Sequence, residues 1–304
     1  MTMEKLPATV KLVEVGPRDG LQNEPATVPT ADKIELIDRL SKTGLRHIET
    51  SSFVRADKIP QLNDAEHVFA GINRRIDIKY TALVPNEKGL TRALAAKVDE
   101  IAIFTAASET FNQKNINASI TKSIERFLPV VELAQHNNLP VRGYISCALG
   151  CPYEGDIAPQ AVVNVARRLD ELGCYEISIG DTIGVGTPPQ AQDLLRQLAD
   201  VIAIENLAVH FHNTHGQALA NIFACLQLGV SVVDASVAGL GGCPYADGAT
   251  GNVATEDVVH MINELGIECG VDLDALLECA WFISDKLGRK PDSKVAIRNR
   301  PSLS

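Results

Sequence analysis

Short, largely apolar runs recur along the chain, and segments with a helical spacing of apolar residues separate them. Apolar runs of this length, bounded by turn residues, are typical of buried strands. The eight predicted strands are Val10–Val15, His47–Ser52, Lys79–Val84, Glu100–Thr105, Val141–Cys147, Tyr175–Gly180, Leu207–His212 and Ser231–Ala238. The predicted amphipathic helices are Thr30–Thr43, Asn86–Ala96, Ser119–Asn137, Pro159–Leu172, Thr187–Ile204, Gln217–Leu228 and Thr255–Leu265.

Glycines at the ends of several predicted helices support this division. Gly44, Gly173 and Gly229 each follow a helical segment, where a left-handed C-cap requires no side chain. Alternating strands and helices indicate parallel strands joined by right-handed crossovers. Eight such units in 304 residues predict an α/β fold, a closed (β/α)₈ TIM barrel. An open doubly wound sheet is the alternative, and the absence of a Gly-x-Gly-x-x-Gly turn after the first strand disfavours it.

The C-terminal part of the chain extends beyond the eighth unit. The segment from Val271 to Lys286 predicts an extra helix, and residues 287–304 form a basic, proline-containing tail for which we expect a solvated terminus. No linker, repeat array or low-complexity stretch interrupts the pattern. Residues 1–304 are therefore expected to form a single domain.

Composition narrows the function classes. With 45% hydrophobic and 22% charged residues the chain is typical of soluble folded proteins, and its net charge of −10 disfavours nucleic acid or an anionic membrane as the main partner. The seven cysteines are scattered and form no Cys-x-x-Cys pair, which indicates a reducing compartment. No signal peptide, arginine-rich presequence or membrane-spanning run is visible. We expect a cytoplasmic protein, although a processed organellar form would have the same pattern.

A pair of histidines at the end of the seventh predicted strand suggests a metal site. His210 and His212 stand two residues apart, so an extended strand directs both imidazoles to the same face. Each neutral imidazole offers one nitrogen lone pair to a shared ion. Two buried histidines satisfied by hydrogen bonds are the alternative.

Further polar residues follow other predicted strands, and the chemistry of a barrel lies at the carboxyl ends of its strands. Asp19 and Asn252 would join the two histidines, because strands one, seven and eight are neighbours in a closed barrel. A carboxylate, two imidazoles and an amide oxygen suit Mg²⁺ or Mn²⁺ better than Zn²⁺. Asp19 as a turn cap and Asn252 as a residue near a helix N-terminus are the alternatives.

Two more residues at this end of the barrel carry charge. Glu49 is a candidate ligand, a partner of a metal-bound water or a buried partner of an arginine. Arg18 either neutralises Asp19 or stabilises a developing oxyanion. Further candidates for contacts to the substrate or to the ligands are Gln22, Tyr144 and Asp181.

The segment from Gly239 to Asn252, GLGGCPYADGATGN, contains five glycines. Glycine-rich loops often bind phosphate, but this one lacks the lysine of a P-loop. It carries Cys243. Most cysteines are small buried apolar residues, whereas a thiol on a glycine-rich loop that faces a cation is suited to proton transfer.

These residues identify a resemblance. The chain resembles the 3-hydroxy-3-methylglutaryl-CoA lyase family over nearly its whole length. The matching stretches are VEVGPRDGLQNE (13–24), VRGYISCALGCPYEG (141–155), CYEISIGDTIGVGT (174–187) and SVAGLGGCPY (236–245). The resemblance implies a barrel enzyme that cleaves 3-hydroxy-3-methylglutaryl-CoA to acetyl-CoA and acetoacetate with a divalent metal ion, and that forms a homodimer.

By motif position, the resemblance also implies residue roles. Arg18 matches the catalytic arginine and Cys243 the catalytic cysteine, while Glu49 is similar to the family's supporting acid. The matched metal ligands are Asp19, His210, His212 and Asn252. Three alternatives stay open: a lyase for a longer 3-substituted acyl-CoA, a condensing synthase of the isopropylmalate or homocitrate type, and a non-catalytic metal-binding scaffold.

Overall fold

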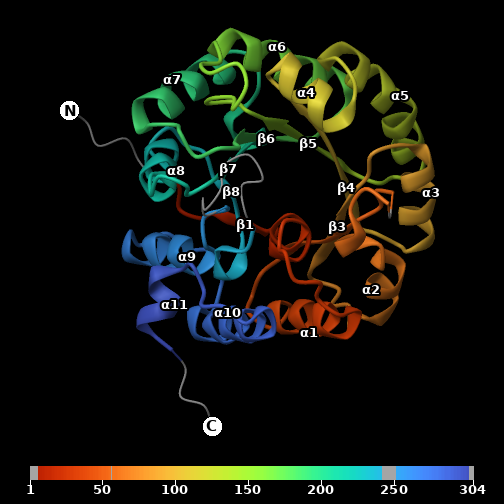
Figure 1. Cartoon of the computed structure of the whole chain (residues 1–304). Helices are drawn as coiled ribbons and strands as arrows, with labels where there is room; N and C mark the ends of the chain where they lie inside the picture. Colours follow the sequence, from red (N-terminus) through yellow and green to blue (C-terminus); the bar gives the residue numbers. More distant parts are fainter. Residues whose placement is uncertain (1–5, 56, 242–250, 301–304) are drawn as a thin grey trace.

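The structure, a computed structural model, describes residues 6–55, 57–241 and 251–300. Its eight parallel strands pair in chain order and close between β8 and β1, so the predicted (β/α)₈ barrel is confirmed and an open sheet is excluded (Figure 1). The strands are β1 (Lys11–Glu14), β2 (His47–Ser52), β3 (Lys79–Leu83), β4 (Glu100–Ala106), β5 (Val141–Ser146), β6 (Glu176–Asp181), β7 (Leu207–Phe211) and β8 (Val232–Ala235).

Helices surround the barrel as an outer ring (Figure 1). They are α1 (Thr30–Leu40), α2 (Ala65–Gly71), α3 (Glu87–Ala95), α4 (Glu109–Ile116), α5 (Ile120–His136), α6 (Pro159–Leu172), α7 (Pro188–Ala199), α8 (Ala218–Leu226), α9 (Thr255–Glu264), α10 (Leu273–Leu287) and α11 (Lys294–Arg298). All seven helices predicted between and after the strands are present. The pattern missed α2 and α4, which are only 7 and 8 residues long, because two turns of helix contain too few apolar positions to show a period.

Gly173 caps the C-terminus of α6 as expected, whereas Gly44 and Gly229 lie in the turns that follow α1 and α8. Gly44, Gly173 and Gly229 have φ values of 94°, 106° and 96°. Only glycine adopts this left-handed conformation without steric cost, so these positions turn the chain toward the next strand.

The segment after α10 differs from the expected solvated tail. The indole Nε1 of Trp281 in α10 donates to the carbonyl of Ala296, and Ala296 is fully buried. Asp257 of α9 accepts hydrogen bonds from the Ser293 hydroxyl and from the backbone N–H of Val295. A buried carboxylate thus binds the start of α11, which explains why a basic segment packs on the barrel.

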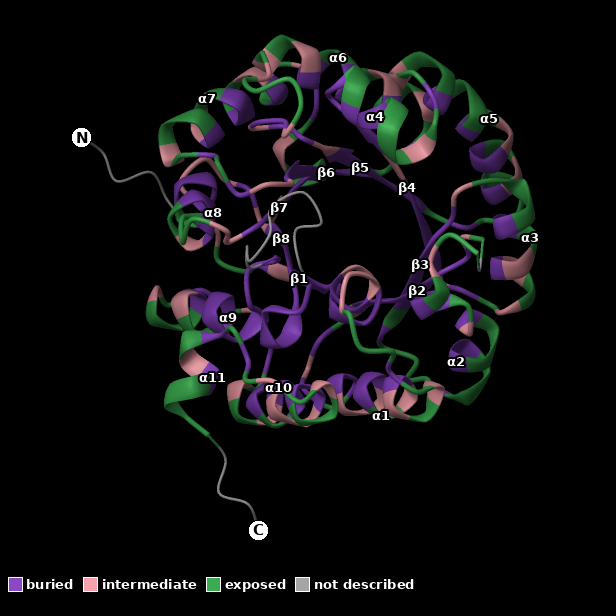
Figure 2. Ribbon diagram, in the orientation of Figure 1, coloured by how far each residue is buried: buried purple, intermediate pink, exposed green. Residues whose placement is uncertain are grey.

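Strand pairing brings the ends of β7, β8 and β1 together. His210 pairs with Asp234, and Val13 also pairs with Asp234. The strands are almost entirely buried, whereas the outer faces of the helices are exposed (Figure 2). Among the described residues, none of the helices combines the length and apolar content that a membrane crossing requires.

Candidate active site

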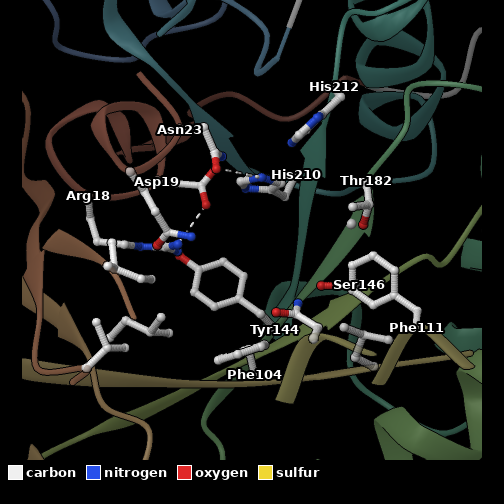
Figure 3. Close-up of a pocket in the computed structure, with 17 residues that line it drawn as sticks. Arg18, Asp19, Asn23, Phe104, Phe111, Tyr144, Ser146, Thr182, His210 and His212 are labelled. Atoms are coloured by element: carbon white, nitrogen blue, oxygen red, sulfur yellow. Dashed lines mark hydrogen bonds and ion pairs between the residues drawn. The ribbon is translucent and has the colours of Figure 1, made fainter. Parts of the chain in front are cut away.

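A five-residue turn directly after β1 carries two of the predicted site residues. The turn, Gly16–Gly20, is a single π-helical turn in which the carbonyl of Val15 accepts the backbone N–H groups of Arg18, Asp19 and Gly20. Such turns are uncommon and often occur at functional sites. Here the turn directs the side chains of Arg18 and Asp19 into the pocket that lies at the end of the barrel (Figure 3).

A buried acid fixes this turn to the segment after β8. Glu14, at the end of β1, is fully buried and accepts hydrogen bonds from the backbone N–H groups of Gly16 and Val237 and from the hydroxyl of Thr255. Burial raises the pKa of Glu14 to about 7, although those hydrogen bonds lower it. The first and last strands are therefore joined by a side chain as well as by their backbone pairing.

The two histidines and Asp19 converge on a common centre. Their possible ligand atoms all lie within 4.8 Å of one another, in a cluster formed by Asp19, His210 and His212. His210 lies in β7 and His212 directly follows it, so the strand alternation places both rings on the same side, with ring centroids 5.6 Å apart (Figure 3). His212 is 7% exposed, and its Nδ1 has no hydrogen-bond partner among the described residues.

Asn252 completes this cluster. It forms an isolated backbone bridge with His212, and its side-chain Nδ2 donates to Asp19 Oδ2 at 2.9 Å and to the carbonyl of Leu240. Because both hydrogen bonds use the amide nitrogen, the amide oxygen is the atom that Asn252 would offer to a metal ion. The donor set and the unsatisfied His212 nitrogen fit a divalent cation.

Arg18 lies beside this cluster in a fixed orientation. Its Nε donates to Glu49 Oε2 at 2.8 Å, its Nη2 lies 2.7 Å from the same oxygen, and its Nη1 donates to Asp19 Oδ1 at 2.6 Å. Glu49 is fully buried and does not line the pocket. Of the roles left open for Glu49, the geometry is that of a buried partner of Arg18.

The electrostatics of the cluster favour an anionic Asp19 and a neutral His212. Burial raises the pKa of Asp19, but the charge of Arg18, then those of His210 and His212, and the Asn252 hydrogen bond outweigh it and hold the pKa at about 2. Burial and the neighbouring His210 lower the pKa of His212 to about 4. For Glu49 burial dominates and its pKa is raised despite Arg18. A carboxylate and a neutral imidazole are the protonation states in which these groups bind metal.

A cavity of about 180 Å³ lies beside the cluster and has a mixed polar and apolar lining. Arg18, Asp19 and the two histidines line it, as does Tyr144, whose ring lies 5.9 Å from that of His210 (Figure 3). The apolar residues of the lining are Val54, Ile59, Leu83, Phe104, Phe111 and Ile145. Of the further candidates from the sequence, Tyr144 and Gln22 line the cavity, so both are placed to touch a ligand.

One predicted residue lies outside the cavity, and another belongs to a segment that the structure does not describe. Asp181 is fully buried and does not line the cavity; its carboxylate accepts the backbone N–H groups of Val185 and Gly186 and so shapes the loop after β6. Burial raises the pKa of Asp181, although these hydrogen bonds lower it. Cys243 lies outside the described residues.

Asp234, which lies in β8 and contacts His210, was not predicted from the sequence as a site residue. Asp234 Oδ2 is 3.3 Å from His210 Nδ1, and Asp234 is only 1% exposed. A single acid within the apolar run SVVDASVA was the available signal. A charged residue in a buried strand requires a partner inside the barrel, and that partner could have been sought among the histidines.

Comparisons with known proteins identify relatives that match nearly the whole chain. A family model described as HMGL-like matches residues 9–283. The cytoplasmic 3-hydroxy-3-methylglutaryl-CoA lyase of Danio rerio is 55% identical over 98% of this chain and 89% of that protein. The 3-hydroxy-3-isohexenylglutaryl-CoA/hydroxymethylglutaryl-CoA lyase of Pseudomonas aeruginosa is also 55% identical, over 96% of this chain and 97% of that protein. Other relatives at the same identity have names that include the word mitochondrial.

A solved structure extends the similarity to the fold. An HMG-CoA lyase from Acinetobacter baumannii, in complex with coenzyme A and 3-methylmalate, matches with a TM-score of 0.92 at 40% identity. The match covers 97% of this chain and 96% of that chain.

Proposed function

This chain belongs to the hydroxymethylglutaryl-CoA lyase family, and we propose that it is a carbon–carbon lyase that cleaves 3-hydroxy-3-methylglutaryl-CoA to acetyl-CoA and acetoacetate. The observation that carries the proposal is the convergence of Asp19, His210 and His212 beside Arg18 in one pocket. Asp19, His210, His212 and Asn252 would hold Mg²⁺ or Mn²⁺. Bound there, a divalent ion would polarise the tertiary hydroxyl group of the substrate and lower its pKa.

Arg18 is placed to act on the charge that develops during cleavage. When the hydroxyl proton leaves, the alkoxide becomes the ketone of acetoacetate, and the electrons of the broken carbon–carbon bond form the enolate of acetyl-CoA. Glu49 and Asp19 hold the guanidinium in place before the reaction, so its donation to the enolate oxygen requires no reorganisation. Cys243 is proposed as the acid that protonates the enolate carbon.

The apolar residues that line the cavity support a second candidate substrate. Val54, Leu83 and Phe104 are suited to an alkyl group on C3, and the Pseudomonas aeruginosa relative is named for an isohexenyl substrate as well as for the methyl one. We therefore propose that a 3-hydroxy-3-substituted glutaryl-CoA with a longer chain is the alternative. The ratio of kcat/KM for the two thioesters distinguishes the candidates.

Three broader features are part of the proposal. Residues 1–304 form a single lyase domain, in agreement with the extent of the family match. The family resemblance supports a homodimer. The name of the Danio rerio relative supports a cytoplasmic location.

The deciding experiment is incubation of the purified protein with 3-hydroxy-3-methylglutaryl-CoA and Mg²⁺, with and without a chelator. We expect acetoacetate in the presence of Mg²⁺, its loss with the chelator, and recovery when Mn²⁺ or Mg²⁺ is restored in excess. Cleavage that persists after the metal is removed would contradict the metal-dependent mechanism. No cleavage of either thioester with metal present would contradict the proposed activity.

A further inference from the structure

A chain of buried charged groups crosses the inside of the barrel and ends at His210. Asp234 of β8 has its Oδ2 at 3.3 Å from His210 Nδ1, and the same oxygen accepts the Ser178 hydroxyl at 2.8 Å. Arg142 of β5 binds both oxygens of Asp234, with Nη2 at 2.7 Å from Oδ1 and Nη1 at 3.0 Å from Oδ2. Such groups are unusual where a barrel interior is ordinarily filled by branched apolar side chains.

Arg142 is itself held by further hydrogen bonds. It is 2% exposed, its Nε donates to Glu176 Oε1 at 2.7 Å, and its Nη1 donates to the hydroxyl of Tyr144 at 2.8 Å. Lys11, at the start of β1, binds the other oxygen of Glu176 at 2.5 Å. The carboxylate of Asp234 is therefore fixed by Arg142 and Ser178, neither of which lines the cavity, and it has little freedom to rotate.

This arrangement makes Nε2 the nitrogen of His210 that offers its lone pair to the cluster of Asp19, His210 and His212. A proton on Nδ1 is directed at Asp234 Oδ2, which leaves the lone pair on Nε2, the nitrogen 3.8 Å from Asp19 Oδ2. Histidines that bind metals commonly donate their other ring N–H to a carboxylate, which sets the tautomer and the orientation of the ring. His212 has no such partner at its Nδ1 among the described residues.

We propose that Asp234 is a positioning residue for the metal site, which orients His210 and fixes its tautomer, and that Arg142 holds Asp234 in place for that role. This inference rests on the proposed function, because it requires His210 to be a metal ligand.

The test compares two variants that each neutralise one buried acid of the same chain. Asp234→Asn removes the carboxylate in contact with His210, whereas Glu100→Gln changes a buried acid of β4 that accepts the Tyr175 hydroxyl and has no part in the proposed arrangement. Binding of Mn²⁺ is measured by electron paramagnetic resonance on protein whose folding is verified by circular dichroism and thermal unfolding. We expect Asp234→Asn to raise the Kd for Mn²⁺ by about 10–100-fold, and Glu100→Gln to leave it close to that of the unaltered protein.

A second readout reports the tautomer without metal. In the metal-free protein labelled with ¹⁵N-histidine, the protonated nitrogen of neutral His210 should be Nδ1, and the Asp234→Asn variant should show a mixture with protonated Nε2. If Asp234→Asn fails to fold, the double variant Asp234→Asn/Arg142→Gln removes both opposite charges and replaces it in both measurements, with the same expected results.

Each outcome of these measurements either supports or overturns the inference. A folded variant that lacks the Asp234 carboxylate but binds Mn²⁺ as tightly as the unaltered protein overturns the inference, and so does an equal loss in Glu100→Gln. In either case the unaltered protein still binds Mn²⁺ and cleaves the thioester, so the proposed function stands. Failure of the unaltered protein to bind Mn²⁺ overturns the metal site and the inference together.

Discussion

Arg18 illustrates how one residue serves both the fold and the chemistry. Its guanidinium contacts the carboxylates of Asp19 and Glu49, and Arg18 is 6% exposed. Burial disfavours the charged guanidinium, but the two carboxylates outweigh it and raise the pKa of Arg18. Removal of one partner from a buried ion pair leaves an uncompensated charge, so its cost exceeds the net stabilisation that the pair provides.

Replacement of Arg18 by methionine should therefore affect both activity and stability. We expect kcat to fall about 10²–10³-fold because the enolate loses a fixed donor, and the free energy of unfolding to fall by about 3–5 kcal/mol because Asp19 and Glu49 lose their partner. Steady-state kinetics and urea unfolding measure the two effects. Arg39→Met, which breaks an exposed pair with Glu35 on α1, is the matched control and should change neither appreciably. An unchanged kcat in folded Arg18→Met would remove Arg18 from the reaction.

At the scale of elements, the turn after β1 depends on close contact with the segment after β8. Glu14 connects the turn to this segment, because its carboxylate accepts the backbone N–H groups of Gly16 and Val237. A Cβ at residue 20 would lie 2.6 Å from Leu240 Cβ and 2.7 Å from Ser236 Oγ. Only glycine allows this approach, which keeps Asp19 near His210.

Gly20→Ala is expected to displace the turn and with it both charged side chains. We expect a destabilisation of about 1–3 kcal/mol, together with a lower kcat and weaker Mn²⁺ binding. Gly266→Ala is the matched control: it lies after α9 with φ +71° and no atom within 4 Å of the added Cβ. Its left-handed conformation should cost about 1–2 kcal/mol of stability without a change in kcat. Equal activity of the two variants would refute the proposed coupling between this contact and the site.

At the scale of the whole molecule, several acids are buried with few opposing charges. Burial raises the pKa of Glu14 to about 7 and that of Glu256 to about 8. At the bottom of the barrel, burial raises the pKa of Glu100 to about 7, although Tyr175 and Arg142 lower it. The folded protein thus retains protons that the unfolded chain, with glutamate pKa values near 4.5, has already released.

Because of these acids, we expect stability to fall as the pH rises above about 6.5, where the lowered pKa values of His47 and His212 no longer oppose their effect. The contribution of the three acids to the free energy of unfolding is fully present below about pH 4.5 and is lost progressively as the pH rises through 7 to 8. Each group contributes a slope of at most about 1.4 kcal/mol per pH unit between those limits. Urea unfolding at a series of pH values should show this decline, and Glu256→Gln, neutral at every pH, should make it less steep. The exposed Glu264→Gln should leave the slope unaltered, and an unaltered slope in Glu256→Gln would contradict the assignment.

The sequence by itself determined the barrel and the set of candidate ligands. The order of strands and helices follows from local periodicity and from glycines that follow helices, and both are properties of neighbouring residues. The two-residue spacing of His210 and His212 places both rings on one face of a strand. Barrel closure then makes the ends of β1, β7 and β8 neighbours, which is why Asp19 and Asn252 could be named.

Only the tertiary structure decided which polar groups act as partners of those ligands. Asp234 reaches His210, and Arg142 reaches Asp234, across strands that are far apart in the chain. The same holds for Asp181, which binds its own loop, and for the segment after α10, which packs on α9 through Asp257. Hydrogen bonds between buried side chains depend on positions in space, and the periodicity of a sequence carries no information on which distant residue will satisfy a buried charge.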